Sequence, residues 1–135
     1  MRIFPTVAVI AIVAVIAAAS ASAAAADLYV VTHPSVSLSA VEVHEVFFGD
    51  KQFAGGVKLA PVENASLQAE FQARVLKIDA ARYNAIWAKK GFREGITPPS
   101  VRSSDAEVIN AIKASPGTVG YVARPTPDVK VIQKY

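Results

Sequence analysis

The hydrophobic pattern after residue 26 alternates between short β-favouring runs and longer segments with helical spacing. Leu28–Thr32 is a run of apolar and β-branched residues that ends at His33-Pro34, and Val57–Val62 is a second such run. Val119–Val122 is a third, and Val129–Ile132 suits a last edge strand. These runs predict four short strands.

The first two helices are predicted from their caps and their apolar faces. Ser39 and Glu42 have the spacing of a capping box, and Gly49 is placed to end the helix as the residue after its C-cap. Phe47 and Phe48, at the end of this helix, are expected to fill the core. The second helix follows the second strand, and its apolar face repeats every three or four residues: Leu67, Phe71, Val75 and Ile78.

Two more helices follow in the second half of the chain. Asp79 is the expected N-cap of a helix that Gly91 ends, and Ser104 with Glu107 forms a second capping box. Between these helices, residues 92–101 are interpreted as a connection that contains glycine and proline.

The turns complete the expected fold. Asp50–Gly56 and Glu63–Ser66 are interpreted as loops, and Pro61 indicates that its strand ends at a sheet edge. Pro116-Gly117 ends the last helix, with Gly117 able to take a positive φ. Gly120 in the following strand marks a bulge or the close approach of another backbone. The sequence thus predicts an α/β fold with a small mixed sheet flanked by about four helices.

The first 26 residues have the pattern of a secretory signal peptide. Met1–Ala26 begins with Arg2 as a short positive region, continues as an apolar run and ends in small residues. The strongly apolar run of about 12 to 14 residues is shorter than the roughly 20 that span a bilayer, which disfavours the alternative of an uncleaved membrane anchor. Cleavage is expected after Ala23 or Ala26, which leaves one domain at 27–135 in the periplasm.

Composition excludes several kinds of chemistry. The chain of 135 residues has no cysteine and a formal net charge of +3, without the basic run that a nucleic-acid-binding surface needs. Its two histidines, His33 and His44, lie on different segments, so no metal site is expected. No phosphate-binding loop, dinucleotide fingerprint or nucleophile elbow is present. We therefore expect a protein that is not an enzyme and has no cofactor.

Several apolar and turn motifs follow one another in a fixed order. They are Phe47-Phe48-Gly49, Pro61-Val62, Phe71, Trp87, Phe92, Pro98-Pro99 and Ser115–Val122. This series resembles one lobe of the phosphate-binding periplasmic proteins of ABC transporters. The resemblance implies a single lobe of the type II periplasmic-binding-protein fold. It also implies solute binding in the periplasm, with phosphate or another small oxyanion as ligand and an ABC transporter or other envelope protein as partner.

The resemblance also suggests where an anion would bind. In the family, an Arg and a Ser-Gly-Thr turn begin the helix that Glu63–Leu67 precedes here, so Asn64 and Ser66 are the candidate ligand-binding residues. The Arg, Gly and Thr are not matched, and Glu63 stands nearby. Thr32 and Ser35, at the end of the first strand, are further candidates because ligands of open α/β sheets bind at strand ends.

Two alternatives stay open. Asn64 or Ser66 can simply cap the helix, and Ser35 can belong to a turn. The first function hypothesis is an exported solute-binding protein of the phosphate-binding type. The second is a single-lobe envelope interaction module that has lost its ligand, with a homo-oligomer formed through the exposed face of the lobe.

Overall fold

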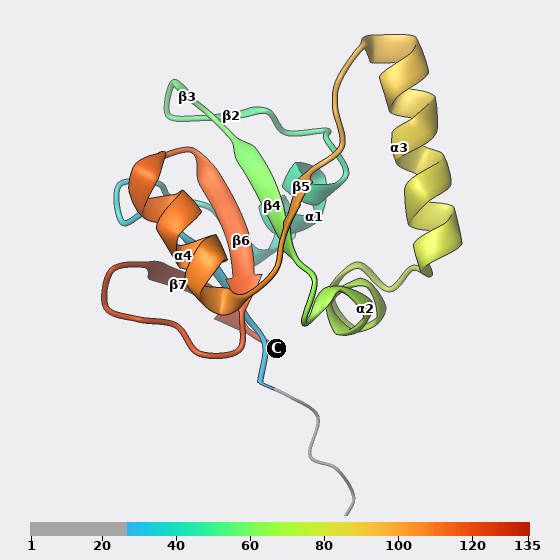
Figure 1. Ribbon diagram of the computed structural model, residues 1–135. Coiled ribbons are helices and arrows are strands. Elements are labelled where there is room, and N and C mark those ends of the chain that lie inside the picture. The colour runs from blue at the N-terminus through green and yellow to red at the C-terminus, as the bar shows by residue number, and fades with distance from the viewer. Residues whose placement is uncertain (1–26) are drawn as a thin grey trace, which may run out of the picture.

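The computed structural model describes residues 27–135, so the expected signal peptide and its cleavage sites lie outside the described residues. A five-stranded mixed sheet with the order β5-β4-β6-β1-β7 forms the centre, beside a two-stranded hairpin of β2 and β3 (Figure 1). The strands are β1 (Tyr29–Thr32), β2 (Phe53–Ala54), β3 (Val57–Lys58), β4 (Ala60–Asn64), β5 (Ser100–Arg102), β6 (Thr118–Val122) and β7 (Lys130–Lys134). The helices are α1 (Ala40–Phe47), α2 (Gln68–Phe71), α3 (Ala80–Glu94) and α4 (Asp105–Ala114), with a π-helical segment, η1 (Gln72–Leu76), after α2.

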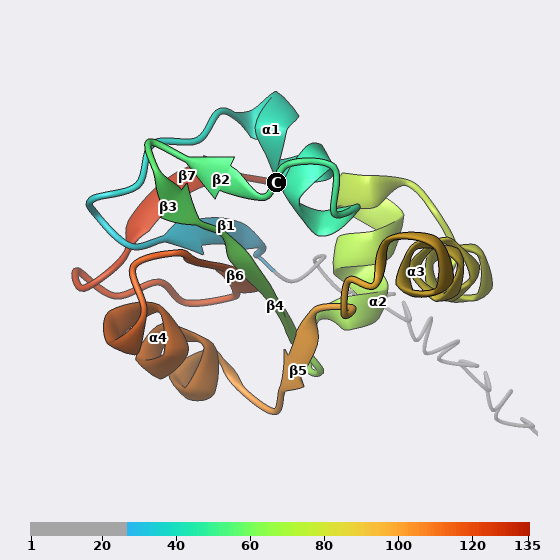
Figure 2. The ribbon, with the colours of Figure 1, turned by 90° about the horizontal axis from the view of Figure 1, so that it is seen from above.

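Helices lie on both faces of the sheet. β4 pairs in parallel with β5 and β6, whereas β1 runs antiparallel to both β6 and β7. Helix α4 covers one face, and α1, α2 and η1 cover the other (Figure 2). Alternate residues of a strand point to opposite faces, so Val31 and Val122 pack with α4 while Val30 and Tyr121 pack toward α1. The expected α/β fold with a small mixed sheet and about four helices is confirmed.

Stacked aromatic rings fill the core on the α1 side. The Phe71 and Tyr121 rings are parallel with centroids 3.9 Å apart, and Phe47 packs against Phe71 at 4.6 Å. Phe47 is fully buried as expected, but Phe48 is only half-buried because it follows the last turn of α1 and contacts Tyr83 at the core's edge.

The capping boxes form largely as predicted. Ser39 Oγ accepts a hydrogen bond from the Glu42 backbone at 3.3 Å, and Glu42 accepts one from the Ser39 backbone at 3.1 Å. At α4, Ser104 Oγ accepts from the Glu107 backbone at 3.4 Å, but the Glu107 carboxylate accepts from Ser103 rather than from Ser104. The starts of α1 and α4 therefore follow from their local sequence, whereas α2 begins after Leu67 without a side-chain cap from Asn64 or Ser66.

Helix α3 begins at the expected cap but ends later than predicted. Asp79 Oδ1 accepts from the Arg82 backbone at 2.7 Å. The prediction that Gly91 ends the helix is wrong, because Gly95 takes the left-handed conformation (φ 67°) and its N–H bonds to the Gly91 carbonyl. Figure 1 shows α3 standing beside the sheet rather than across it.

Four segments differ from the sequence-based expectation. The strand predicted at 57–62 is divided into β3 and β4, and β4 extends through Glu63 and Asn64 into the predicted loop at 63–66. The predicted loop at 50–56 contains β2 and turns through Gly55 and Gly56, both at positive φ, into β3. The expected connection at 92–101 ends in strand β5. The second helix is divided into α2 and η1, and Lys77 ends it with a φ of 54°.

β4 is a central strand, but the part that holds Pro61 has a neighbour on one side only, so the prediction that this end of the strand lies at a sheet edge holds locally. β5 pairs only with Val62–Asn64, whereas Ala60 and Pro61 pair only with β6. The Ala60 N–H donates to the Gly117 carbonyl at 2.8 Å on the β6 side. Since successive residues of a strand direct their backbone groups to opposite sides, Pro61 faces the side where β4 has no neighbour. Its missing N–H leaves no unpaired donor there.

A glycine in β6 lets α4 pack closely on the sheet. A Cβ at Gly120 would lie 2.5 Å from Val108 Cγ1 and 3.1 Å from Val62 Cγ2. The expected close approach is therefore present, but side chains rather than a backbone make it. Gly120→Ala should lower the free energy of unfolding by about 1–3 kcal/mol through overpacking, measured by urea denaturation.

Gly91→Ala is the matched control for this substitution. Gly91 lies inside α3, and the nearest atom to its added Cβ is 3.4 Å away. Alanine there should be neutral or stabilising, because glycine is a poor helix former. Equal destabilisation in both variants would contradict the assigned packing.

Candidate functional site

The four sequence-predicted site residues lie at two different ends of the sheet. Asn64 ends β4, and Ser66 follows it by two residues. Thr32 ends β1 and pairs with Val119, near the start of β6, because β1 runs antiparallel to β6; Ser35 lies just beyond it. The structure brings Asn64 and Ser66 together but does not place them with Thr32 and Ser35.

The buried Asn64 side chain is fully engaged in hydrogen bonds within the chain. Its Nδ2 donates to Asp105 Oδ1 at 2.7 Å and to the Tyr121 carbonyl at 3.2 Å. Its Oδ1 accepts from the Ser66 backbone N–H at 3.1 Å and from Ser66 Oγ at 2.5 Å. Both amide protons and both lone pairs are thus used, and Asn64 links β4, α4 and β6.

The Asp105 carboxylate also accepts hydrogen bonds from two backbone N–H groups beside Asn64. Its Oδ2 accepts from the backbone N–H groups of Ala123 and Arg124, each at 3.1 Å. These groups lie at the carboxyl end of the parallel strands, where ligands of open α/β sheets bind. The chain's own carboxylate therefore stands where an anion would be expected, and the assignment of a ligand to Asn64 and Ser66 stays a prediction.

Thr32 and Ser35 have different surroundings. Thr32 is buried, and its Oγ1 has no hydrogen-bond partner among the described residues. Ser35 is exposed, and its Oγ lies 2.7 Å from His33 Nδ1. This short-range bond is typical of turn chemistry. A ligand role for either residue also stays a prediction.

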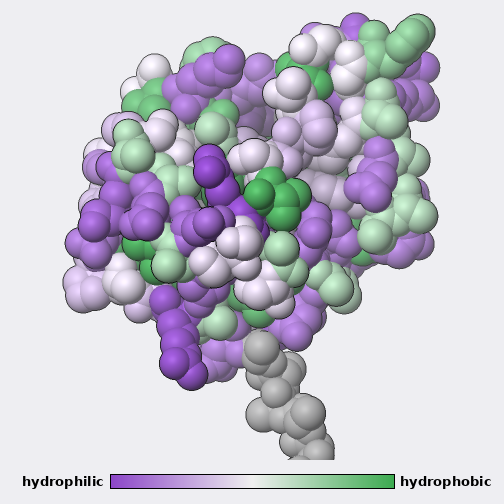
Figure 3. All heavy atoms as spheres, in the orientation of Figure 1, coloured by the Kyte–Doolittle hydropathy of each residue, from purple (hydrophilic) through white to green (hydrophobic). Residues whose placement is uncertain are grey.

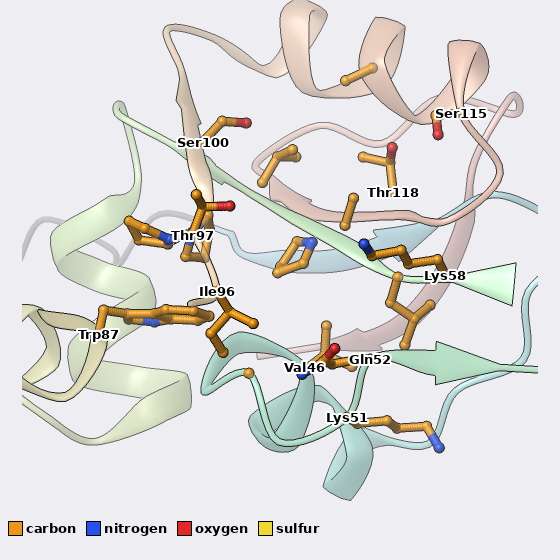
Figure 4. Close-up of a pocket in the computed structure, with 18 of the residues that line it drawn as sticks. Val46, Lys51, Gln52, Lys58, Trp87, Ile96, Thr97, Ser100, Ser115 and Thr118 are labelled. Carbon is orange, nitrogen blue, oxygen red and sulfur yellow. The ribbon is translucent and has the colours of Figure 1, made fainter. Parts of the chain in front are cut away.

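An open cleft of about 620 Å³ lies beside the half of β4 that β5 leaves unpaired. Its walls are the start of β4, the segment from Gly95 to Ser100, the end of α4 and the start of β6 (Figure 4). The volume falls within the roughly 300–1,000 Å³ of small-molecule sites. This cleft, rather than the predicted turn, is the candidate site that the structure offers.

The charges lining the cleft are all positive. Lys51, Lys58 and Arg102 line it, and no aspartate or glutamate does. Lys51 pairs with Glu42 at 3.0 Å, but in the described part of the chain neither Lys58 nor Arg102 forms an ion pair. In Figure 4 the Lys58 ammonium points toward the middle of the cleft, whereas Lys51 points away. The site therefore favours an anion.

Hydroxyl groups add donors that can complement such a charge. The hydroxyl-bearing residues that line the cleft are Thr97, Ser100, Ser115 and Thr118. The sequence analysis did not identify them as site residues. Two of them lie in the segment 92–101, interpreted as a connection, and two lie beside the turn at Pro116-Gly117. The one available signal was Lys58, the single charged residue of the apolar run at 57–62.

A direct backbone contact fixes the position of Lys58. A Cβ at Gly117 would lie 1.9 Å from the Lys58 carbonyl oxygen, so only glycine permits this contact. Gly117 is not among the glycines at positive φ, and the expectation of a left-handed turn there is wrong. Its function is to let the turn after α4 pack on the backbone of β3.

The one acidic residue of β4 is buried away from the cleft. Glu63 is only 2% exposed, and Gln68 Nε2 donates a hydrogen bond to its Oε2. Burial raises the pKa of the Glu63 carboxyl, and the nearby Tyr83 hydroxyl and the hydrogen bond from Gln68 oppose that shift in part. Its Oε1 and the Tyr121 hydroxyl have no hydrogen-bond partners of normal geometry among the described residues. Glu63 therefore does not counter the positive charge of the lining.

Comparison with solved structures identifies the class of fold: the chain has the α/β fold of one lobe of a periplasmic binding protein. One similar structure is a putative phosphate ABC transporter substrate-binding protein with bound phosphate from Clostridium perfringens. It is 14% identical, aligns over 80% of this chain and 45% of its own, and has a TM-score of 0.58. Another is PstS from Borrelia burgdorferi, with 20% identity, 72% and 41% coverage, and a TM-score of 0.52.

The chain spans less than half the length of these solved structures. No protein-family model matches the sequence, and no curated protein matches it. Within residues 27–135, no helix is long and apolar enough to span a bilayer.

Proposed function

We propose that this chain is an exported, single-lobe solute-binding protein that takes a small oxyanion such as phosphate in the cleft beside Lys58. The observation that carries this proposal is the lining of the cleft, which has positive charges and hydroxyl donors but no carboxylate. Support comes from the fold, which it shares with a transporter protein solved with bound phosphate. In this proposal the protein is periplasmic, is not an enzyme, and presents its ligand to an ABC transporter or other envelope protein.

The geometry sets the expected strength of binding. Among residues 27–135 the Lys58 ammonium forms no ion pair, so an anion can gain a charge-assisted hydrogen bond without breaking one. The cleft is open on one side, so a bound ion keeps part of its water. We therefore expect weaker binding than in a protein that closes two lobes on its ligand.

Thermal unfolding with and without millimolar phosphate tests the proposal, with chloride at matched ionic strength as the control. A ligand at 100 times its dissociation constant stabilises the folded state by about 2.7 kcal/mol, which raises the Tm by several degrees for a domain of this size. Lys58→Gln should reduce this phosphate-specific shift to about half, because it removes the charge that points into the cleft and weakens binding about tenfold. Ser66→Ala should keep it.

The two variants separate the two candidate positions. Loss of the shift in Ser66→Ala but not in Lys58→Gln would place the anion at the turn after β4 and reject the cleft. Absence of a specific shift for any small oxyanion would reject oxyanion binding as the function.

One observation favours the alternative of an envelope interaction module. Phe92 on α3 is 94% exposed, the most exposed large hydrophobic side chain of the described residues, and a partner could cover it. However, the face seen in Figure 3 carries hydrophobic side chains singly among hydrophilic ones rather than as a broad patch. Self-association of the protein in light scattering, together with no anion effect, would support the interaction module.

A further inference from the structure

The cleft has a polar side and an apolar side. In Figure 4 the hydroxyl-bearing Ser100, Thr118 and Ser115 lie on one side. Trp87, Ile96 and Val46 lie on the other, where Gln52 is their polar neighbour. A phosphate ion is only a phosphorus atom and its oxygens, so it would use a small part of a space of about 620 Å³. It would also leave the apolar side in contact with water.

Contacts within the chain fix the apolar side of the cleft. Trp87 is 5% exposed, and its Nε1 donates to the Phe47 carbonyl at 3.1 Å. A Cβ at Gly49 would lie 2.8 Å from the Trp87 ring and 3.2 Å from Ile96 Cδ1, so the two side chains pack together over this glycine. Preformed apolar walls bind apolar groups without a large ordering cost.

The charged side is equally defined. The close contact between Gly117 and the Lys58 carbonyl fixes the backbone that carries the ammonium. The ammonium points into the cleft, and no carboxylate lines the cleft to neutralise it. A ligand that matches both sides carries one anionic group and one apolar body.

Building on the anion-binding function proposed above, we infer that the cleft binds an organic anion in preference to inorganic phosphate. The anionic group lies beside Lys58, and the apolar body lies against Ile96 and the edge of Trp87. The ligand class is thus a small phosphate ester or carboxylate with a compact hydrophobic substituent. Contact with the apolar wall favours an organic anion over inorganic phosphate, and Lys58 favours an anion over a neutral ligand.

Fluorescence titration of the purified protein tests this inference. Trp87 is the only tryptophan of the chain and borders the cleft, so its emission reports on this site. The probes are phenyl phosphate, inorganic phosphate and benzyl alcohol, each followed also by calorimetry. We expect phenyl phosphate to bind about tenfold or more tightly than inorganic phosphate, and benzyl alcohol to bind more weakly than phenyl phosphate.

Three variants separate the two sides of the cleft. Ile96→Ala should weaken phenyl phosphate about fivefold and leave inorganic phosphate within about twofold. Lys58→Gln should weaken both anions about tenfold. Lys89→Gln removes an exposed lysine of α3 outside the cleft and should change neither affinity.

Each result has a definite meaning. Equal affinity for phenyl phosphate and inorganic phosphate, or an unchanged phenyl phosphate affinity in Ile96→Ala, would overturn the inference and leave the proposed anion binding intact. Benzyl alcohol binding as tightly as phenyl phosphate would reject the role of Lys58. Binding of neither anion would reject the proposed function and, with it, this inference.

Discussion

Trp87→Ala is expected to lower the free energy of unfolding by about 3–5 kcal/mol, a large part of the roughly 5–15 kcal/mol that stabilises a typical domain. Trp87 and Tyr83 are the two buried residues of α3, and both donate a hydrogen bond to the Phe47 carbonyl at 3.1 Å. Truncation of Trp87 removes one of these bonds and most of the apolar contact between α3 and Gly49. Urea denaturation followed by circular dichroism measures the loss.

Phe92→Ala is the matched control on the same helix. Phe92 is also a large aromatic residue, but its exposure of 94% means that its truncation should change stability by no more than about 0.5 kcal/mol. A Trp87→Ala variant as stable as Phe92→Ala would show that α3 is not held in place by Trp87.

Glu63→Gln is expected to stabilise the protein at neutral pH by about 1–3 kcal/mol. Folding raises the pKa of the Glu63 carboxyl above its ordinary value of 4.5, chiefly through burial, so the folded state binds the proton more tightly than the unfolded state. The contribution of Glu63 to the free energy of unfolding is therefore fully present below pH 4.5. It is lost as the pH rises through the raised pKa of the folded state. Glutamine stays neutral, so it avoids the cost of a buried charge.

Denaturation curves between pH 4 and pH 8 measure this effect. The stability gained by Glu63→Gln should grow as the pH rises. Glu107→Gln is the contrasting control, because the hydrogen bond from the Ser103 N–H lowers the pKa of the exposed Glu107 carboxyl. The Glu107→Gln variant should be less stable than the original protein at neutral pH, and this difference in stability should fade as the solution becomes acidic. A Glu63→Gln variant with an effect independent of pH would contradict the charged, buried state of Glu63.

The features predicted correctly from the sequence are those that neighbouring residues determine. The Ser39 and Asp79 caps, the glycine after α1 and the buried strand β6 all depend on residues a few positions apart. β5 and the β2–β3 hairpin were missed because their segments are only two or three residues long and become strands through pairing. The true end of α3 was missed because Gly91 and Gly95 are both possible caps in the sequence.

The cleft could not be predicted from the sequence because its lining residues are far apart along the chain. Its walls come from separate parts of the chain, around Val46, Lys58, Trp87, Ile96 and Thr118, and only the tertiary fold brings them together. In the same way, nothing near Asn64 in the sequence indicates that Asp105, 41 positions away, uses its amide. Short-range patterns identified polar residues at strand ends but not whether they were already engaged.

The position of Pro61 also affects how the molecule behaves among its own copies. The start of β4 is open on the side away from β6, and an open strand can recruit a strand of another chain, which leads to aggregation. Pro61 faces that side without an N–H, so an incoming strand would lack one hydrogen bond of its ladder. Pro61 thus leaves no unpaired N–H beside the cleft. It also makes this open side of β4 a poor partner for a strand of another chain.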